Sequence, residues 1–209
     1  MKWDELLQVV GKEPVFHSSL LLAGSVDPVD MGRQLSRWVR SGKLIQFRRG
    51  LYALSEQHQK TSPHRFLIAN RLKRASYVSM QSALEHYGLI PEYVPSVSSV
   101  TTGRPETVST PVGAFIFRHI RTELFREYRT IVIDDRQSVF MAAPEKALLD
   151  LLYLTPGSDN LNYLRGLRLQ NMTKINLEFL AELAESTGSQ KLTRAAHKLQ
   201  ALMPELDES

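Results

Sequence analysis

The first 54 residues contain three helical signals followed by two strand signals, and this order restricts the fold more than any other feature of the chain. Four apolar residues at helical spacing predict the first helix: Trp3, Leu6, Leu7 and Val10. Two more short helices are expected, one over residues 18–23 with Ser18 as its N-cap and one over residues 28–41. Residues 44–48 and 51–54 are strand-like, and glycine lies in the short connection between them, as in many hairpins. The order helix, helix, helix, hairpin predicts an N-terminal winged helix-turn-helix.

The predicted third helix has two faces of opposite character. Asp27 is a suitable N-cap before Pro28, and Gly42 provides a stop signal. At about 100° per residue, one side of the helix is apolar, and it is formed by Met31, Leu35, Trp38 and Val39. The opposite side is polar and carries Arg33, Ser36, Arg37 and Arg40, with Asp30 and Gln34 on a flank.

A charged outer face is normal for any surface helix, so this face alone does not define a function. Arginine, however, grips phosphate or guanine with two hydrogen bonds, and the third helix of this order is the one that enters the major groove of DNA. Arginines at the hairpin tip suit phosphates or a narrow minor groove. The residues predicted to contact DNA are Ser18, Asp30, Arg33, Gln34, Ser36, Arg37, Arg40, Lys43, Arg48 and Arg49.

The rest of the chain predicts a second domain. Residues 55–62 are polar and lack apolar periodicity, which indicates a linker between a domain over residues 1–56 and another over residues 63–209. Helices are expected at 63–73, 77–87, 144–154, 161–169, 177–185 and 191–202. Strands are expected at 97–101, 114–120, 130–133 and 138–141. The predicted fold class is α+β, with a small, mainly antiparallel sheet in the C-terminal domain.

Composition sets further bounds. The net charge is +4, and most of the excess lies in residues 1–54, where eight basic residues face five acidic ones. A local basic surplus favours a polyanionic partner. The chain has no cysteine, which excludes disulfides, thiolate metal sites and thiol nucleophiles. Without a long uncharged apolar run or a signal-like N-terminus, a cytoplasmic protein with no membrane partner is expected.

Enzyme signatures are weak. Asp134-Asp135 precedes Glu145-Lys146, but a restriction-type nuclease needs its last acid and lysine separated by one residue on a strand. Here the two are adjacent at the start of a predicted helix, where Lys146 and Asp150 form an i, i+4 pair. The histidines lack metal-binding spacing, and no glycine-rich phosphate loop occurs. We therefore expect no enzyme: no catalytic residue, no metal and no cofactor.

Two further basic clusters are present in the predicted C-terminal domain. The first contains Arg118, His119, Arg121, Arg126 and Arg129, with Glu123 and Glu127 between them. The second contains Arg65, Arg71, Lys73 and Arg74. A solvated, paired surface is the interpretation favoured for both, and a second surface for DNA or a protein partner is the alternative.

Three segments resemble the AbiEi-type antitoxin and transcriptional regulator family. They are residues 41–52 (SGKLIQFRRGLY), which resemble the family's wing, residues 76–91 (SYVSMQSALEHYGLIP) and residues 143–153 (APEKALLDLLY). The matches follow the family's order and extend over about residues 3–155. Gln46 and Phe47 depart from the wing pattern, where members often have arginine or another polar residue, so the preference for bases is expected to differ.

The resemblance implies a role in abortive infection. Its members are type IV antitoxins in which a winged helix represses the protein's own operon and the C-terminal domain opposes a nucleotidyltransferase-like toxin. The expected partner is a double-stranded DNA operator with repeats, bound by a monomer or weak dimer. Two alternatives stay open: a transcriptional regulator without a toxin partner, and a winged helix that docks a protein instead of DNA.

Overall fold

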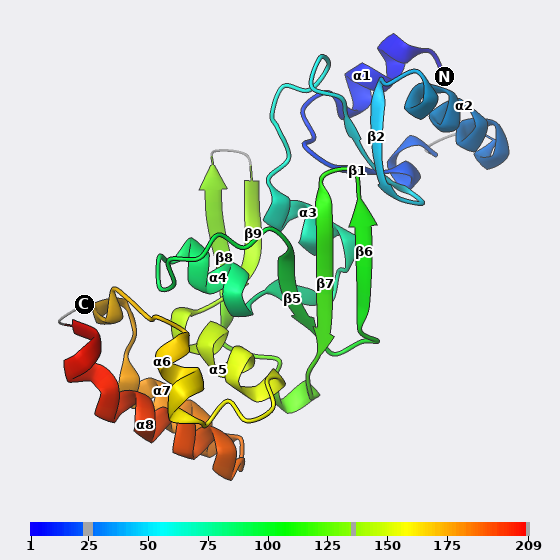
Figure 1. Ribbon diagram of the computed structural model, residues 1–209. Coiled ribbons are helices and arrows are strands. Elements are labelled where there is room, and N and C mark those ends of the chain that lie inside the picture. Colours follow the sequence, from blue (N-terminus) through cyan, green and yellow to red (C-terminus); the bar gives the residue numbers. More distant parts are fainter. Residues whose placement is uncertain (23–26, 135–136, 208–209) are drawn as a thin grey trace.

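Figure 1 shows the computed structural model, which describes residues 1–22, 27–134 and 137–207, with side chains described as far as residue 202. The N-terminal region forms one end of the molecule. Its elements are α1 (Trp3–Val10), β1 (Phe16–His17), the 3₁₀ turn η1 (Ser18–Leu21), α2 (Pro28–Arg40), β2 (Leu44–Arg48) and β3 (Leu51–Leu54). The three strands form an antiparallel sheet in the order β1-β3-β2.

The start of α2 is fixed as the sequence predicted. One carboxylate oxygen of Asp27 accepts hydrogen bonds from the backbone N–H of Val29 at 2.7 Å and of Asp30 at 2.9 Å. Pro28 occupies the first turn, where its missing N–H leaves no intrahelical hydrogen bond unmade. Gly42 follows the helix with φ of +69°, a conformation that glycine adopts without a steric penalty.

The predicted second helix is wrong in its extent. Phe16 and His17 pair with Tyr52 and Leu51 in the sheet, so the chain stays extended up to Ser18. Only a 3₁₀ turn follows, and its cap is His17, whose side chain accepts a hydrogen bond from a backbone N–H, rather than Ser18. The predicted end of this helix, at residue 23, lies outside the described residues.

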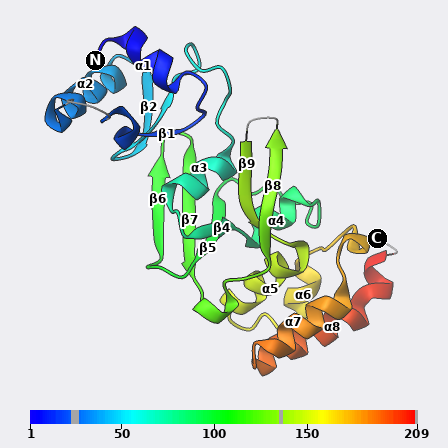
Figure 2. The same ribbon diagram turned by 180° about the vertical axis from the view of Figure 1, so that it is seen from behind.

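The C-terminal region combines a six-stranded sheet with helices. Its strands are β4 (Ser76–Val78), β5 (Val97–Thr101), β6 (Glu106–Thr110), β7 (Gly113–His119), β8 (Tyr128–Asp134) and β9 (Gln137–Ala142). Its helical elements are α3 (Arg65–Leu72), α4 (Met80–His86), η2 (Thr122–Leu124), α5 (Pro144–Leu154), α6 (Leu161–Gly166), η3 (Met172–Lys174), α7 (Leu177–Ser186) and α8 (Gln190–Asp207). Helices α3 and α4 lie on opposite faces of the sheet, and α5–α8 gather at the end of the molecule away from α2 (Figures 1 and 2).

The α+β class is confirmed, and two details of the sheet differ from the prediction. Among the described residues its order is β6-β7-β5-β4-β9-β8, in which β5/β7 and β4/β9 pair in parallel and the other pairs are antiparallel. The predicted helix over residues 77–87 begins only at Met80, because residues 76–78 form β4. Strand β6 is absent from the prediction, since four of its five residues are polar.

Strand β3 joins the two regions through a packed interface. Its residues alternate strictly between two hydrophobic clusters, as side chains of a strand point to opposite faces. Tyr52 and Leu54 pack with α1 and α2, while Leu51 and Ala53 belong to the core of the C-terminal region. The hairpin is therefore held between the two regions rather than projecting freely from one of them.

Candidate nucleic-acid interface

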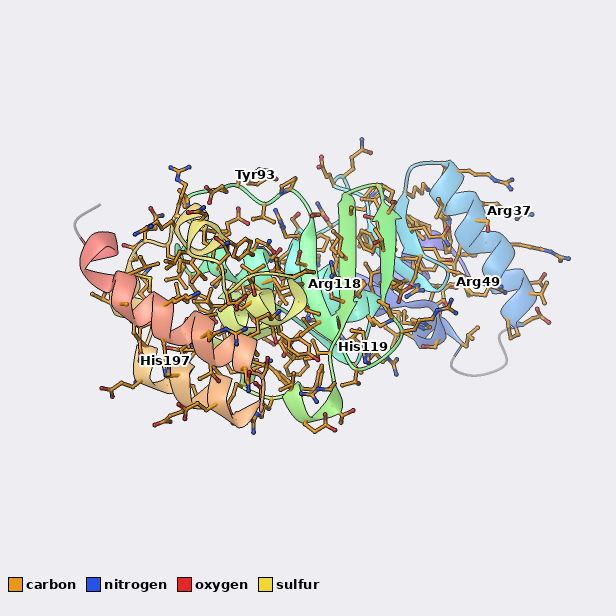
Figure 3. All side chains as sticks on the ribbon, turned by 60° about the horizontal axis from the view of Figure 1, so that its bottom comes forward. Arg37, Arg49, Tyr93, Arg118, His119 and His197 are labelled. Carbon is orange, nitrogen blue, oxygen red and sulfur yellow. The ribbon has the colours of Figure 1, made fainter. Side chains whose placement is uncertain are left out.

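Helix α2 has one buried and one exposed face. Met31, Leu35 and Trp38 are buried and belong to the N-terminal core. The polar residues of the predicted outer face are all exposed: Arg33, Ser36, Arg37 and Arg40. Figure 3 shows Arg37 on the side of α2 that points away from the rest of the molecule. The predicted division of this helix into a core face and an arginine face is therefore found in the structure.

The arginines of this face differ in their neighbours. Arg37 and Arg40 form no ion pair with any residue that the structure describes. Arg33 donates to the carboxylate of Asp30 at 3.1 Å, but the two side chains are 69% and 73% exposed. A solvated pair of this kind contributes at most about 1 kcal/mol, so all three guanidinium groups remain accessible to an anion.

Other predicted contact residues are partly engaged within the protein. The hydroxyl of Ser36 donates to the backbone carbonyl of Gly32 at 2.9 Å. The ammonium of Lys43 lies 5.0 Å from the centre of the Trp3 ring, in a cation–π contact. Gln34 is half-buried on the flank of α2. Ser36, which is hydrogen-bonded on the arginine face, and the half-buried Gln34 and Lys43 are less available to a ligand than Arg37 and Arg40.

The hairpin tip is held against the start of η1. The backbone N–H of Ser18 donates to the carbonyl of Gly50 at 2.8 Å. Gly50 has φ of +88°, and a Cβ atom there would lie 3.1 Å from the ring of His17, so a larger residue does not fit without movement. Arg49 is exposed at this tip and has no ion pair among the described residues.

Arg48, another predicted contact residue, has contacts within the protein, although its side chain is 42% exposed. It donates to the backbone carbonyl of Leu72 at 2.8 Å and lies 3.4 Å from a carboxylate oxygen of Glu106. Lys73 binds the other oxygen of Glu106 at 2.7 Å. This hydrogen bond and the two positive charges lower the pKa of Glu106. A bulge in β2 between Gln46 and Arg48 disturbs the alternation of side chains just before this residue.

The first of the two basic clusters, the one that contains Arg118, also has contacts within the protein. Arg121 donates to the carbonyl of Thr187 at 3.4 Å, and Arg126 donates to the hydroxyl of Ser186 at 2.5 Å. Both contacts tie the segment after β7 to the end of α7. Arg118 is exposed without an ion pair in the described part of the chain.

A buried polar cluster lies between β4 and α5. The hydroxyls of Tyr77 and Ser79 donate to one carboxylate oxygen of Asp150 at 3.0 and 2.7 Å, and Lys146 binds the other oxygen. All four residues are almost fully buried. Burial raises the pKa of Asp150, and Lys146 with the two hydroxyls acts in the opposite direction. The Lys146–Asp150 pair was predicted from its spacing, but its burial and its hydroxyl partners were not.

The residues considered for nuclease chemistry have structural contacts here. Glu145 accepts a hydrogen bond from the backbone N–H of Asn176 at 2.7 Å. Asp134 accepts one from the amide of Gln137 at 2.6 Å. Asp135 lies outside the described residues. Across residues 1–22, 27–134 and 137–207, no three histidine, aspartate or glutamate side chains lie close enough to hold a metal ion.

Comparison with known proteins bears on the fold. No protein-family model matches the chain, and no curated protein matches it in sequence. No helix in the described part of the chain combines the length and apolar character needed to cross a bilayer. The fold is similar to that in the crystal structure of the RV2827C protein from Mycobacterium tuberculosis, with a TM-score of 0.56 and 14% sequence identity. The match covers 94% of this chain and 75% of that one, so the similarity extends over both regions of the α+β fold.

Proposed function

We propose that this protein binds double-stranded DNA through a winged helix-turn-helix formed by residues 1–54 and acts as a transcriptional regulator. The observation that carries the proposal is the exposed arginine face of α2, whose Arg37 and Arg40 have no ion pair among the described residues. Unpaired surface guanidinium groups on a helix are suited to phosphates and to the edges of guanine.

The order of elements supports this proposal. The chain passes from α1 through β1 and η1 to α2 and then through β2 to β3, and the sheet order is β1-β3-β2. In this arrangement η1 takes the place of the second helix, α2 is the reading helix and the β2–β3 hairpin is the wing. We assign base or phosphate contacts to Arg33, Arg37 and Arg40, and a backbone or minor-groove contact to Arg49.

The experiment is a binding titration against duplex DNA from the region upstream of the protein's own gene, repeated at several salt concentrations. The double variant Arg37→Ala/Arg49→Ala should bind more weakly at every salt concentration, and its salt slope should be smaller by about one unit for each lost phosphate contact. The matched control is Lys12→Ala/Lys60→Ala, because these exposed lysines line a separate hollow beside α1. Equal affinity of the Arg37/Arg49 variant and the wild type would refute the assignment.

We further propose an antitoxin role, which is based on the resemblance of residues 41–52, 76–91 and 143–153 to AbiEi-type proteins. In this role the winged helix represses its own operon and the C-terminal region opposes a nucleotidyltransferase-like toxin. The test is co-expression with the neighbouring reading frame. Growth arrest by that frame alone, relieved by this protein, supports the role, whereas a harmless neighbour favours a regulator without a toxin.

A further inference from the structure

A large hollow lies where the N-terminal and C-terminal regions meet. Its volume is about 790 Å³. One side is formed by β1 and η1, with His17 and Ser19, and the other by α3 and β9, with Asn70 and Phe140. Arg71 and Arg74 also line it, at and just after the end of α3. The hollow is thus a groove that begins beside the first residues of η1.

The four basic residues around the end of α3 have different partners. Lys73 is paired with Glu106, and Arg65 donates to the backbone carbonyl of Val94. The side chains of Arg71 and Arg74 are exposed and have no hydrogen bond or ion pair with any described residue. The expectation of a paired surface is therefore wrong for these two. Glu13 is the acid that lines the groove with them.

The groove is continuous with the hairpin tip. His17 lines the groove, and its ring would lie 3.1 Å from a Cβ atom at position 50 in the turn. Arg48 binds the backbone carbonyl of Leu72, which lies between Arg71 and Arg74 in the chain. The tip that carries Arg49 is therefore fastened to the segment that carries the two unpaired arginines.

We propose that duplex DNA bound by α2 and the hairpin continues across this groove, where Arg71 and Arg74 neutralise phosphates of its backbone. The inference rests on the proposed DNA-binding function and extends it, because the C-terminal region becomes part of the interface. Two cations without internal partners, held beside a wing, match the regular negative charge of a DNA backbone. Arg48 acts as a positioning residue that keeps the hairpin tip and the end of α3 together.

The test measures the salt dependence of affinity for two duplexes, a long one and one trimmed to the part that α2 and the hairpin cover. On the long duplex, Arg71→Gln/Arg74→Gln should lower the salt slope by about two units, because each phosphate contact contributes about 0.9. On the trimmed duplex the variant and the wild type should bind alike. The control Arg118→Gln removes an exposed arginine from another hollow and should behave as wild type on both. Thermal unfolding of each variant verifies that it is folded.

The outcomes separate this inference from the proposed function. Equal slopes for the wild type and the Arg71/Arg74 variant on the long duplex overturn the extended interface, and the proposed function stands if Arg37→Ala still weakens binding. If the Arg71/Arg74 variant loses as much salt slope on the trimmed duplex as on the long one, the extended interface is also overturned. The two arginines would then contact the same stretch of DNA as α2 and the hairpin. If the wild-type protein binds no duplex DNA, both the proposed function and the extended interface are wrong.

Discussion

Helix α2 and the buried polar cluster between β4 and α5 use charged side chains in opposite ways. On α2, Arg37 and Arg40 are exposed and unpaired within the described chain, and the core beneath them is apolar. Between β4 and α5, Lys146 and Asp150 are buried and paired, with two hydroxyls completing the carboxylate's hydrogen bonds. A charge that is paired inside the protein contributes to stability, whereas a charge without a partner at the surface is available to bind a ligand.

The largest effect expected from this difference is on stability. Asp150→Ala leaves the ammonium of Lys146 buried without its partner, so we expect a loss of about 3–5 kcal/mol in the free energy of unfolding, measured by denaturant titration. Lys146→Met in the same chain should restore much of that loss, because no buried charge then remains. A single variant within about 1 kcal/mol of wild type would show that the buried pair is not structural.

For Arg37 we expect the opposite, a change in DNA affinity without a change in stability. Arg37→Ala should weaken binding to a specific DNA site by about 1–3 kcal/mol if the guanidinium reads a base, and should leave the unfolding temperature unchanged. Calorimetric unfolding and a binding titration on the same sample measure both quantities. Lys12→Ala, at an exposed residue beside another hollow, is the matched control. If Arg37→Ala lowers stability without changing DNA affinity, Arg37 has a structural role and the contrast with Asp150 is wrong.

The smallest effect is expected from a histidine cap. The Nδ1 atom of His64 accepts the backbone N–H of Phe66 at 3.2 Å at the start of α3, and this requires the ring to be neutral at that atom. Burial, and then the charges of His86 and Arg65, lower the pKa of His64 below its ordinary value of 6.5. As the pH falls, His64 therefore binds a proton at a higher pH in the unfolded chain than in the folded protein. The contribution of neutral His64 to the free energy of unfolding is complete above pH 6.5, and it is lost as the pH falls through the folded-state pKa of this residue.

His64→Asn should flatten this dependence, because asparagine accepts the same kind of capping hydrogen bond without titrating. Denaturant unfolding between neutral and mildly acidic pH measures it. DNA affinity should show no matching change over this range, since arginine does not titrate there. If the free energy of unfolding of the variant depends on pH as it does in the wild type, His64 is not the group responsible.

Local signals in the sequence predicted much of the proposed interface. The Asp27 cap, the proline after it and the apolar spacing of α2 all act within a few residues, so the two faces of this helix followed from the sequence. Helix α5 also has the predicted bounds, 144–154, because Pro144 starts it and an apolar run fills it.

Features that depend on distant contacts could not be predicted in this way. The role of Arg48 is set by Glu106, which is 58 residues away, and by the carbonyl of Leu72. Strand β1 exists because Phe16 and His17 pair with β3, although two residues carry no periodicity of their own. The buried setting of Asp150 depends on hydroxyls of Tyr77 and Ser79, more than seventy residues earlier in the chain.

The most direct measurement is arginine modification by phenylglyoxal, with and without duplex DNA, read residue by residue by mass spectrometry. DNA should protect Arg37, Arg40 and Arg49, and leave the exposed Arg118 as reactive as it is in the free protein. The result that would contradict the account is equal modification of the three arginines in both samples, or protection of Arg118 in their place.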